Sequence, residues 1–245
     1  MKIIKLIPNT FTLLNLLCGL IAILCLSNGF YDDAFKFVCL GIFFDFWDGF
    51  LARKLNAQSD LGLQLDSLAD MVTSGVVPGI LLFRLIDSLQ QNRPEFMVTE
   101  DQFYLGILPY LGFLVTLASC YRLANFNIDS RQTNSFIGLP TPANTLLIMS
   151  IPMIQYVDNY HWLVKILENP YVLVLIAIVS SYLLNAEIPL FSLKFKKFSW
   201  KESKLQILFV LFAAILLVLL SFIAIPIIIL SYIIISVVVN RFGKK

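Results

Sequence analysis

The sequence DFWDGFLAR at residues 45–53, followed by GLQLDSLAD at residues 62–70, places four carboxylates among residues otherwise suited to lipid. In a helix, Asp45 and Asp48 project from one face, and so do Asp66 and Asp70. An aspartate at the centre of a membrane helix costs roughly 2.5 to 3.5 kcal/mol on insertion scales, and neighbouring carboxylates also repel one another. Two such helices, face to face, would form one cluster that requires a cation.

Divalent metal ions are the natural partners for this cluster. No His or Cys accompanies the aspartates, and hard oxygen ligands favour Mg²⁺ or Mn²⁺ over zinc. We therefore predict two divalent ions held by Asp45, Asp48, Asp66 and Asp70, at a place where phosphate oxygens complete the coordination. The alternative is that these acids only cap helices at the membrane interface, which would not require the small residues between them.

The composition indicates an integral membrane protein. The 245 residues are 58% hydrophobic and 14% charged, and the mean hydropathy is +0.82, whereas soluble domains are about half apolar and a quarter charged. The apolar runs approach the roughly 20 residues that cross a bilayer as a helix. We predict an all-α, polytopic membrane helix bundle with no separate soluble domain. We interpret the four cysteines as small buried hydrophobes, because they show no metal-binding spacing.

Eight apolar segments are expected to span the membrane, at about residues 8–27, 34–51, 61–86, 103–124, 140–156, 171–186, 205–223 and 226–239. Pro8 is expected to begin the first helix. Gly75, Pro78 and Gly79 predict a kink or loosening within the third. Residues 87–102, 129–135 and 158–169 are expected to form polar loops. The N-terminal run has no convincing cleavage site, so we interpret it as a retained helix rather than a signal peptide.

The distribution of Lys and Arg predicts the orientation. With eight spans, the basic segments all fall on one side, which the positive-inside rule assigns to the cytoplasm together with both termini and the aspartates. The lysine-rich loop at residues 194–204 could also attract anionic lipid, although a role in orientation is the simpler interpretation. The basic residues on which the predicted orientation rests are Lys2, Lys5, Arg53, Lys54, Arg122, Arg131, the lysines of this loop, Arg241, Lys244 and Lys245.

The acidic stretch resembles the signature of the CDP-alcohol phosphotransferase family, D-x-x-D-G-x-x-A-R, eight residues, then G-x-x-x-D-x-x-x-D. The resemblance implies a six-helix core, which we place at residues 1–193, followed by a basic loop and two extra transmembrane helices at residues 194–245. It also implies a homodimer in a bacterial or archaeal cell membrane and a CDP-activated lipid, CDP-diacylglycerol, as substrate.

The resemblance also suggests roles for single residues. Asp45, Asp48 and Asp66 correspond to metal ligands, and Asp70 to a general base that also touches a metal. Asn9 and Thr12 form a polar stripe with Asn15, which either caps the helix or holds substrate phosphate or the aspartate cluster. The small residues either leave room for the nucleotide or allow close helix packing. The residues expected to bind CDP-diacylglycerol are Asn9, Thr12, Gly49, Ala52, Arg53 and Gly62.

A second resemblance concerns the alcohol that accepts the lipid. RLANFN at residues 122–127 and FIGLPTPA at residues 136–143 are similar to motifs of the phosphatidylserine synthase branch, although Asn125 stands where that branch usually has arginine. The resemblance implies L-serine as acceptor. A zwitterion needs a cation for its carboxylate, so Arg122 and Arg131, with Asn127 as a hydrogen-bond partner, are the candidate serine-binding residues. The arginines could instead serve orientation alone.

We therefore expect an enzyme that transfers the phosphatidyl group from CDP-diacylglycerol to the serine hydroxyl, giving phosphatidylserine and CMP. The same chemistry with glycerol 3-phosphate or an inositol phosphate is an alternative that would demand a denser basic pocket. A cation-coupled transporter would need polar residues along several spans, yet the last three segments are almost wholly aliphatic. Aspartate-rich prenyltransferases are a further metal-dependent class, but diphosphate recognition alone does not require Gly49, Ala52 and Arg53.

Overall fold

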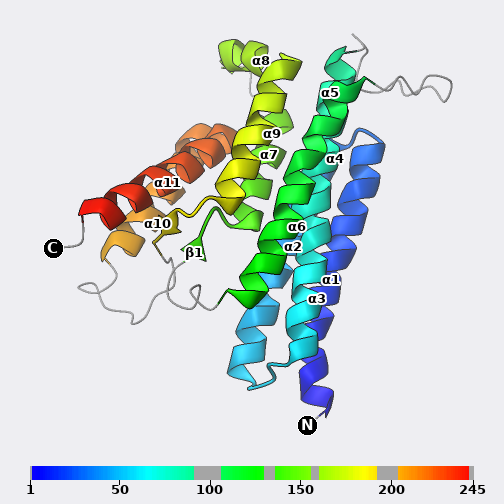
Figure 1. The fold of residues 1–245 in the computed structure, drawn as a ribbon, viewed down its shortest axis with the longest axis vertical. Coiled ribbons are helices and arrows are strands. Elements are labelled where there is room, and N and C mark those ends of the chain that lie inside the picture. Colours follow the sequence, from blue (N-terminus) through cyan, green and yellow to red (C-terminus); the bar gives the residue numbers. More distant parts are fainter. Residues whose placement is uncertain (1, 91–105, 130–135, 156–159, 192–203, 243–245) are drawn as a thin grey trace.

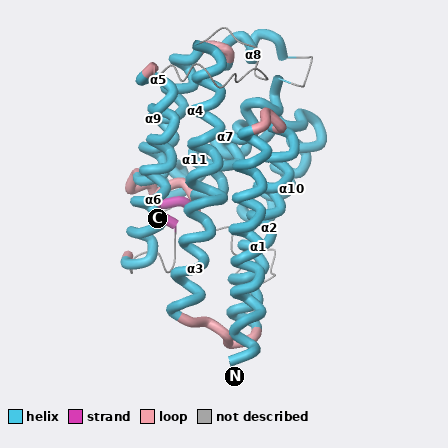
Figure 2. The backbone as a smooth tube through the Cα atoms, turned by 90° about the vertical axis from the view of Figure 1, so that its right-hand side faces the viewer, coloured by secondary structure: helices cyan, strands magenta, loops and turns pink. Residues whose placement is uncertain are grey.

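A computed structural model describes residues 2–90, 106–129, 136–155, 160–191 and 204–242. Helix α1 (Lys2–Ser27) and helix α2 (Tyr31–Lys54) form an antiparallel pair joined by a tight turn, in which Gly29 has a φ of 78°. Figure 1 shows these helices beside α3 and α4 in one elongated bundle, and Figure 2 shows the N-terminus at one end of it. Pro8 lies inside α1, so the expectation that it begins the helix is wrong: residues 2–7 add further helical turns before it.

The third predicted span is one helical run from residue 60 to residue 90, made of α3 (Asp60–Asp70), the π-helix η1 (Met71–Val76) and α4 (Val77–Gln90). The Ser59 hydroxyl accepts a hydrogen bond from the Gly62 amide at 3.1 Å and thereby caps α3. The irregularity predicted from Gly75 occurs as the π-helix, which begins directly after Asp70. Single π-turns inside helices are frequently found at functional sites.

Side chains of two neighbouring helices hold η1 in place. Thr116 donates a hydrogen bond to the carbonyl of Gly75 at 2.9 Å, and Thr145 donates one to the carbonyl of Ser74 at 2.8 Å. Thr116 belongs to the run α5 (Ile107–Tyr110), η2 (Leu111–Phe113) and α6 (Leu114–Ile128), and Thr145 belongs to α7 (Thr141–Gln155). The π-helix is thus fixed between α6 and α7 rather than left as a loose kink.

Two loop predictions require correction. Residues 161–167 form helix α8 (His161–Leu167), which meets α9 (Pro170–Asn185) at 78°, because the apolar residues between His161 and Leu167 form a short helix where a polar loop was expected. Residues 87–90 continue α4 and not the loop expected at residues 87–102; the rest of that expected loop, residues 91–102, lies outside the described residues. The expected loop at residues 129–135 likewise falls largely outside them.

A short antiparallel strand pair was not predicted. Strand β1 (Phe136–Ile137) pairs with β2 (Pro189–Leu190), with Phe136 opposite Leu190. Beyond it, α10 (Lys204–Leu220), the 3₁₀ turn η5 (Ser221–Ile223) and α11 (Ala224–Phe242) form the C-terminal part, and α11 packs against α7, α10 and β2. Tyr232 donates a hydrogen bond to the carbonyl of Phe191 at 2.7 Å and so ties α11 to the strand pair.

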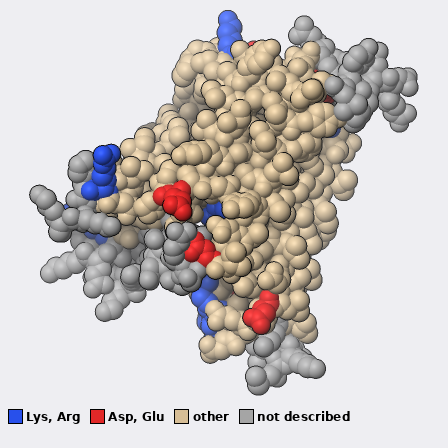
Figure 3. Space-filling model, viewed as in Figure 1, with Lys and Arg blue, Asp and Glu red and all other residues tan. Residues whose placement is uncertain are grey.

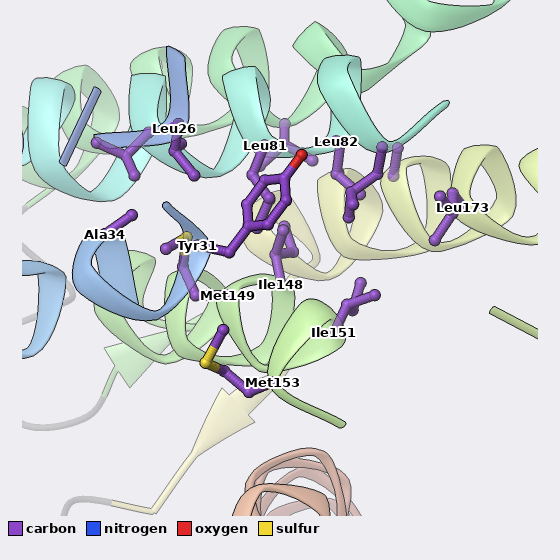
Figure 4. Packing of buried hydrophobic residues seen from close by; sticks show 14 of the residues in the cluster. Leu26, Tyr31, Ala34, Leu81, Leu82, Ile148, Met149, Ile151, Met153 and Leu173 are labelled. Atoms are coloured by element: carbon purple, nitrogen blue, oxygen red, sulfur yellow. The ribbon is translucent and has the colours of Figure 1, made fainter. Parts of the chain in front are cut away.

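The main apolar core lies where α1, α2, α4, α7 and α9 meet. Figure 4 shows Leu26 and Tyr31 facing Leu81 and Ile148, all of which are at most 2% exposed. Burial of such side chains is the chief source of stability in the part of a membrane protein where helix packs on helix. The face seen in Figure 3 is mostly uncharged, as expected of a surface that meets lipid.

The helices agree with an integral membrane protein. Four described stretches are long and apolar enough to cross a membrane, and the bent pair α8 and α9 adds a fifth if it forms one span. As far as the structure describes them, the predicted segments coincide with helices or helical runs, but α7 has 15 residues and α2 carries many charges, so eight crossings remain a prediction. The four stretches are Leu6–Ser27, Asp60–Gln90, Ile107–Ile128 and Lys204–Arg241.

The junction between β1 and α7 yields a stability prediction. Gly138 has a φ of 75°, and a Cβ on it would collide with the carbonyl oxygen of Leu184. We expect Gly138→Ala to lower the free energy of unfolding by at least about 1 to 2 kcal/mol, the cost of a left-handed backbone for an L-residue. The measurement is denaturant unfolding in detergent. The matched control is Gly49→Ala, whose Cβ would meet only the Arg53 guanidinium, at 3.4 Å; equal stability of the two variants would contradict the prediction.

Candidate functional site

Three of the four predicted aspartates converge. One carboxylate oxygen from each of Asp45, Asp48 and Asp66 lies within 4.8 Å of the other two. The first two come from α2 and the third from α3, and α1 packs against both helices. Asp48 is only 5% exposed. The two halves of the acidic sequence, separated by a turn at residues 55–59, therefore meet in space as their helical spacing predicts.

Asp70 lies beside this group rather than within it. Its carboxylate accepts a hydrogen bond from Nδ2 of Asn15 at 3.0 Å. Its charge interacts with those of Asp66 and Arg122. Since Asp70 is the last residue of α3, the π-helix that follows fixes its position. Asp70 thus stands between a polar residue of α1 and a buried cation of α6.

The polar stripe of α1 faces the aspartates. The Thr12 hydroxyl donates a hydrogen bond to Oδ2 of Asp48 at 2.6 Å, and Asn15 binds Asp70 as described. Asn9 lies opposite Gly62, where a Cβ would come within 3.3 Å of the Asn9 side-chain oxygen. Hydrogen bonds to ionised acceptors are stronger than those between neutral groups. Of the two interpretations of this stripe, contact with the acidic cluster is the one that the geometry supports.

A cavity of about 450 Å³ opens next to the acidic cluster. Arg53 lines this cavity, and a Cβ on Gly49 would stand 3.4 Å from one of its guanidinium nitrogens, in ordinary van der Waals contact. The sequence reasoning missed the wall made by the turn between α2 and α3, because nothing in the composition of residues 57–60 marks a binding site. The lining residues are Pro8, Asn9, Thr12, Asp48, Gly49, Ala52, Arg53, Ala57, Gln58, Ser59, Asp60, Gly62, Leu63 and Asp66, which include all six predicted for CDP-diacylglycerol.

The two predicted serine-binding residues that the structure describes, Arg122 and Asn127, have different partners. Arg122 is 7% exposed on α6 and interacts electrostatically with Asp70. Asn127, at the end of the same helix, donates a hydrogen bond to Ser67 at 2.9 Å and so joins α6 to α3. Arg131 lies outside the described residues. Of the two described candidates, Arg122 is therefore the one whose charge acts on the acids.

The site has the properties of a divalent metal site. The donor atoms are carboxylate oxygens, and buried Oδ1 of Asp66 has no hydrogen-bond partner. Among the described residues, no Lys or Arg forms an ion pair with Asp45, Asp48 or Asp66. Buried charges in proteins are normally paired or coordinate metals. Asp45, Asp48 and Asp66 therefore fit an oxygen-liganded ion such as Mg²⁺ or Mn²⁺.

Comparison with known proteins defines the class. Residues 5–181 match the family described as CDP-alcohol phosphatidyltransferase, and the chain belongs to this family. The cavity, the aspartates and the stripe of α1 all lie within the matched region.

The names of individual relatives are more specific than the description of the family. The chain is 39% identical over 140 residues to CDP-diacylglycerol–serine O-phosphatidyltransferase of Bacillus subtilis, which covers 56% of this chain and 69% of that protein. The enzyme of the same name from Methanocaldococcus jannaschii is 34% identical over 154 residues, 63% of each chain. That from Helicobacter pylori is 28% identical over 215 residues, 87% of this chain and 82% of the relative.

The contact between Thr12 and Asp48 yields a prediction on metal binding. Thr12→Val keeps the shape of the side chain but removes the hydrogen bond to the Asp48 carboxylate. Loss of a hydrogen bond to a metal ligand typically weakens metal affinity by about 10-fold to 100-fold. We expect at least a tenfold weaker affinity for Mn²⁺, measured by titration with electron paramagnetic resonance in detergent.

The matched control is Thr10→Val. Thr10 lies on the same helix, is exposed, and donates its hydrogen bond to the carbonyl of Leu6, so its loss should leave Mn²⁺ affinity unchanged. Equal Mn²⁺ affinities for the two variants would show that Thr12 does not orient a metal ligand.

Proposed function

We propose that this protein transfers the phosphatidyl group of CDP-diacylglycerol to the hydroxyl of L-serine, producing phosphatidylserine and CMP. The observation that carries the proposal is the convergence of Asp45, Asp48 and Asp66 beside a cavity lined by small residues and by Arg53, Asn9 and Thr12. The names of the relatives support this activity and L-serine as acceptor.

The proposed cofactor is a pair of Mg²⁺ or Mn²⁺ ions. Asp45, Asp48 and Asp66 would hold them, with Asp70 at the edge of the site. When bound, such ions stabilise the negative charge that develops on the pyrophosphate during transfer. Support comes from the unpartnered oxygen of Asp66 and from the lack of an ion pair to the cluster among the described residues.

The cavity is proposed to bind the nucleotide end of CDP-diacylglycerol. Gly49, Ala52 and Gly62 provide space, because a larger side chain at either glycine would approach Arg53 or Asn9. Arg53 supplies a cation for phosphate, and Asn9 and Thr12, which also line the cavity, supply hydrogen bonds. The acyl chains would extend along the exposed apolar helices into lipid, which suits a substrate that is part phosphate and part hydrocarbon.

Asp70 is proposed as the general base. It takes the proton from the serine hydroxyl while the hydroxyl oxygen attacks the phosphorus of the phosphatidyl group, and the bond from this phosphorus to the CMP oxygen breaks with its electron pair leaving on CMP. The hydrogen bond from Asn15 orients the Asp70 carboxylate. Arg122, next to Asp70, is placed to attract the serine carboxylate, so that the hydroxyl lies at the base.

The proposed setting is the cell membrane of a bacterium or archaeon, with both termini and the aspartates on the cytoplasmic side. Support comes from the basic residues near the ends of the predicted spans. We also propose residues 1–193 as the catalytic core, residues 194–245 as an added pair of helices, and a homodimer as the assembly. Support for this division of the chain comes from the family match, which ends at residue 181.

The first test is CMP release from CDP-diacylglycerol by the purified protein in detergent. We expect release that requires both L-serine and a divalent ion, that stops with a chelator, and that returns on addition of Mg²⁺ or Mn²⁺. Glycerol 3-phosphate and an inositol phosphate serve as competing acceptors. Faster release with either of them than with L-serine would contradict the proposed acceptor.

The second test separates the base from the metal ligands. Asp70→Asn keeps the hydrogen-bonding shape but cannot accept the proton, so we expect kcat to fall by about 10²-fold to 10⁴-fold. Mn²⁺ affinity should change little, since Asp70 lies outside the group of converging carboxylates. The control is Asp32→Asn, an exposed acid paired with Lys36 at the far end of α2. Unaltered kcat in Asp70→Asn would remove Asp70 from the mechanism.

A further inference from the structure

Four buried side chains behind the acidic cluster hold polar atoms without a hydrogen-bond partner. Within the described part of the chain these atoms are Oγ of Ser74, Oγ of Ser119, Nε of Arg122 and both the Nδ2 and Oδ1 atoms of Asn144. Ser119 and Asn144 are 0% exposed and Ser74 is 1% exposed. Most buried polar groups in folded proteins are hydrogen-bonded, so a group of such atoms indicates missing partners.

The helices that carry these residues pack against the π-helix. Ser74 lies in η1, and its carbonyl accepts the hydrogen bond from Thr145, the residue next to Asn144 on α7. Across η1, Cβ of Ser119 lies 3.2 Å from where a Cβ on Gly75 would stand, which places α6 against the same turn. Arg122 follows Ser119 by one helical turn and interacts with the charge of Asp70. The three elements that carry these residues, η1, α6 and α7, thus pack together at the turn that follows the proposed base.

Neighbouring hydroxyl groups do not share this property. Thr73 donates to the carbonyl of Asn15 at 3.0 Å, and Thr116 and Thr145 donate to carbonyls of η1. These threonines hold the π-helix to α1, α6 and α7 and have their partners within the protein. The unpartnered set is therefore separate from the side chains that hold the fold together at this place.

The unpartnered atoms match the polar groups of an amino acid. Nε of Arg122 and Nδ2 of Asn144 are donors suited to a carboxylate, whereas Oδ1 of Asn144 and the two serine hydroxyls are acceptors suited to an ammonium group. A polyol phosphate offers no ammonium group to these oxygens. A site built to hydrogen-bond a substrate group rejects an analogue that lacks it, because the site's own polar groups then stay buried without partners.

We propose that Asn144, with Ser74 and Ser119, forms the inner half of the acceptor site and selects the zwitterionic head of L-serine over other alcohols. This inference rests on the proposed function, and it adds residues outside both the acidic signature and the basic residues from which an acceptor site was expected. Asn144 binds the ammonium and carboxylate groups of serine through its two amide atoms, while Arg122 holds the carboxylate on the side nearest Asp70.

The test compares kinetic constants for the two substrates in Asn144→Ala. We expect the KM for L-serine to rise about tenfold, the effect of one lost hydrogen bond to a charged group, and the KM for CDP-diacylglycerol to stay within about twofold. The preference for L-serine over 3-hydroxypropionate, which lacks the ammonium group, should fall by about tenfold as well. Ser119→Ala, a smaller change, provides a second variant with the same direction of effect should Asn144→Ala fail to fold.

The matched control is Ser150→Ala. Ser150 is a buried polar residue of the same helix, but its hydroxyl donates to the carbonyl of Leu147 within α7. We expect both KM values of this variant to equal those of the unmodified protein. If Asn144→Ala and Ser119→Ala leave the serine KM unchanged, or raise both KM values alike, the residues serve only packing or bind water, and the inference is overturned.

Failure of this inference differs from failure of the proposed function. If the unmodified protein releases no CMP on addition of L-serine, the proposed function itself is wrong, and with it the inference. If the unmodified protein is active with L-serine and the variants keep its KM and its preference, only the assignment of Asn144, Ser74 and Ser119 is wrong.

Discussion

Repulsion among buried carboxylates is the constraint on which the rest of this structure depends. Asp45, Asp48 and Asp66 bring their oxygens within a few ångströms of one another between membrane helices, and Asp70 adds a fourth charge nearby. Such a group is tolerated in an apolar bundle only when hydrogen bonds and cations compensate it. Thr12 and Asn15 provide hydrogen bonds, Arg122 provides a charge, and divalent ions would supply the remainder.

The helix that carries Thr12 and Asn15 therefore has two tasks. Helix α1 packs along α2 and α3, and its polar stripe fixes the direction of the carboxylates that those helices carry. Its remaining faces are apolar and meet either the bundle core or the surroundings. Close packing at this place uses small residues, since a Cβ on Gly41 would come within 2.9 Å of the Asn15 side-chain oxygen. Precise placement of acids thus depends on close backbone approach.

The π-helix η1 links the acidic cluster to the other half of the bundle. It begins directly after Asp70. Its own Thr73 donates a hydrogen bond to α1, and Thr116 of α6 and Thr145 of α7 donate hydrogen bonds to its carbonyls. Any shift of α6 or α7 against η1 would move Asp70 and Arg122 relative to each other. The extra residue of a π-turn rotates the following helix, so α4 can fill the apolar core while α3 presents its acids.

The sequence by itself determined that the chain is a helical membrane protein and that Asp45, Asp48, Asp66 and the residues around Gly49 and Gly62 share one site, because helical periodicity and fixed spacing are local properties. It did not reveal α8, the β1–β2 pair, the wall of the cavity at residues 57–60, or the buried group at Ser74, Ser119 and Asn144. Apart from α8, these features depend on contacts between segments far apart in the chain. Only the tertiary structure decided that Asn127 joins α6 to α3 through Ser67 while Arg122 lies beside Asp70, since a difference of five residues on one helix directs side chains to different neighbours.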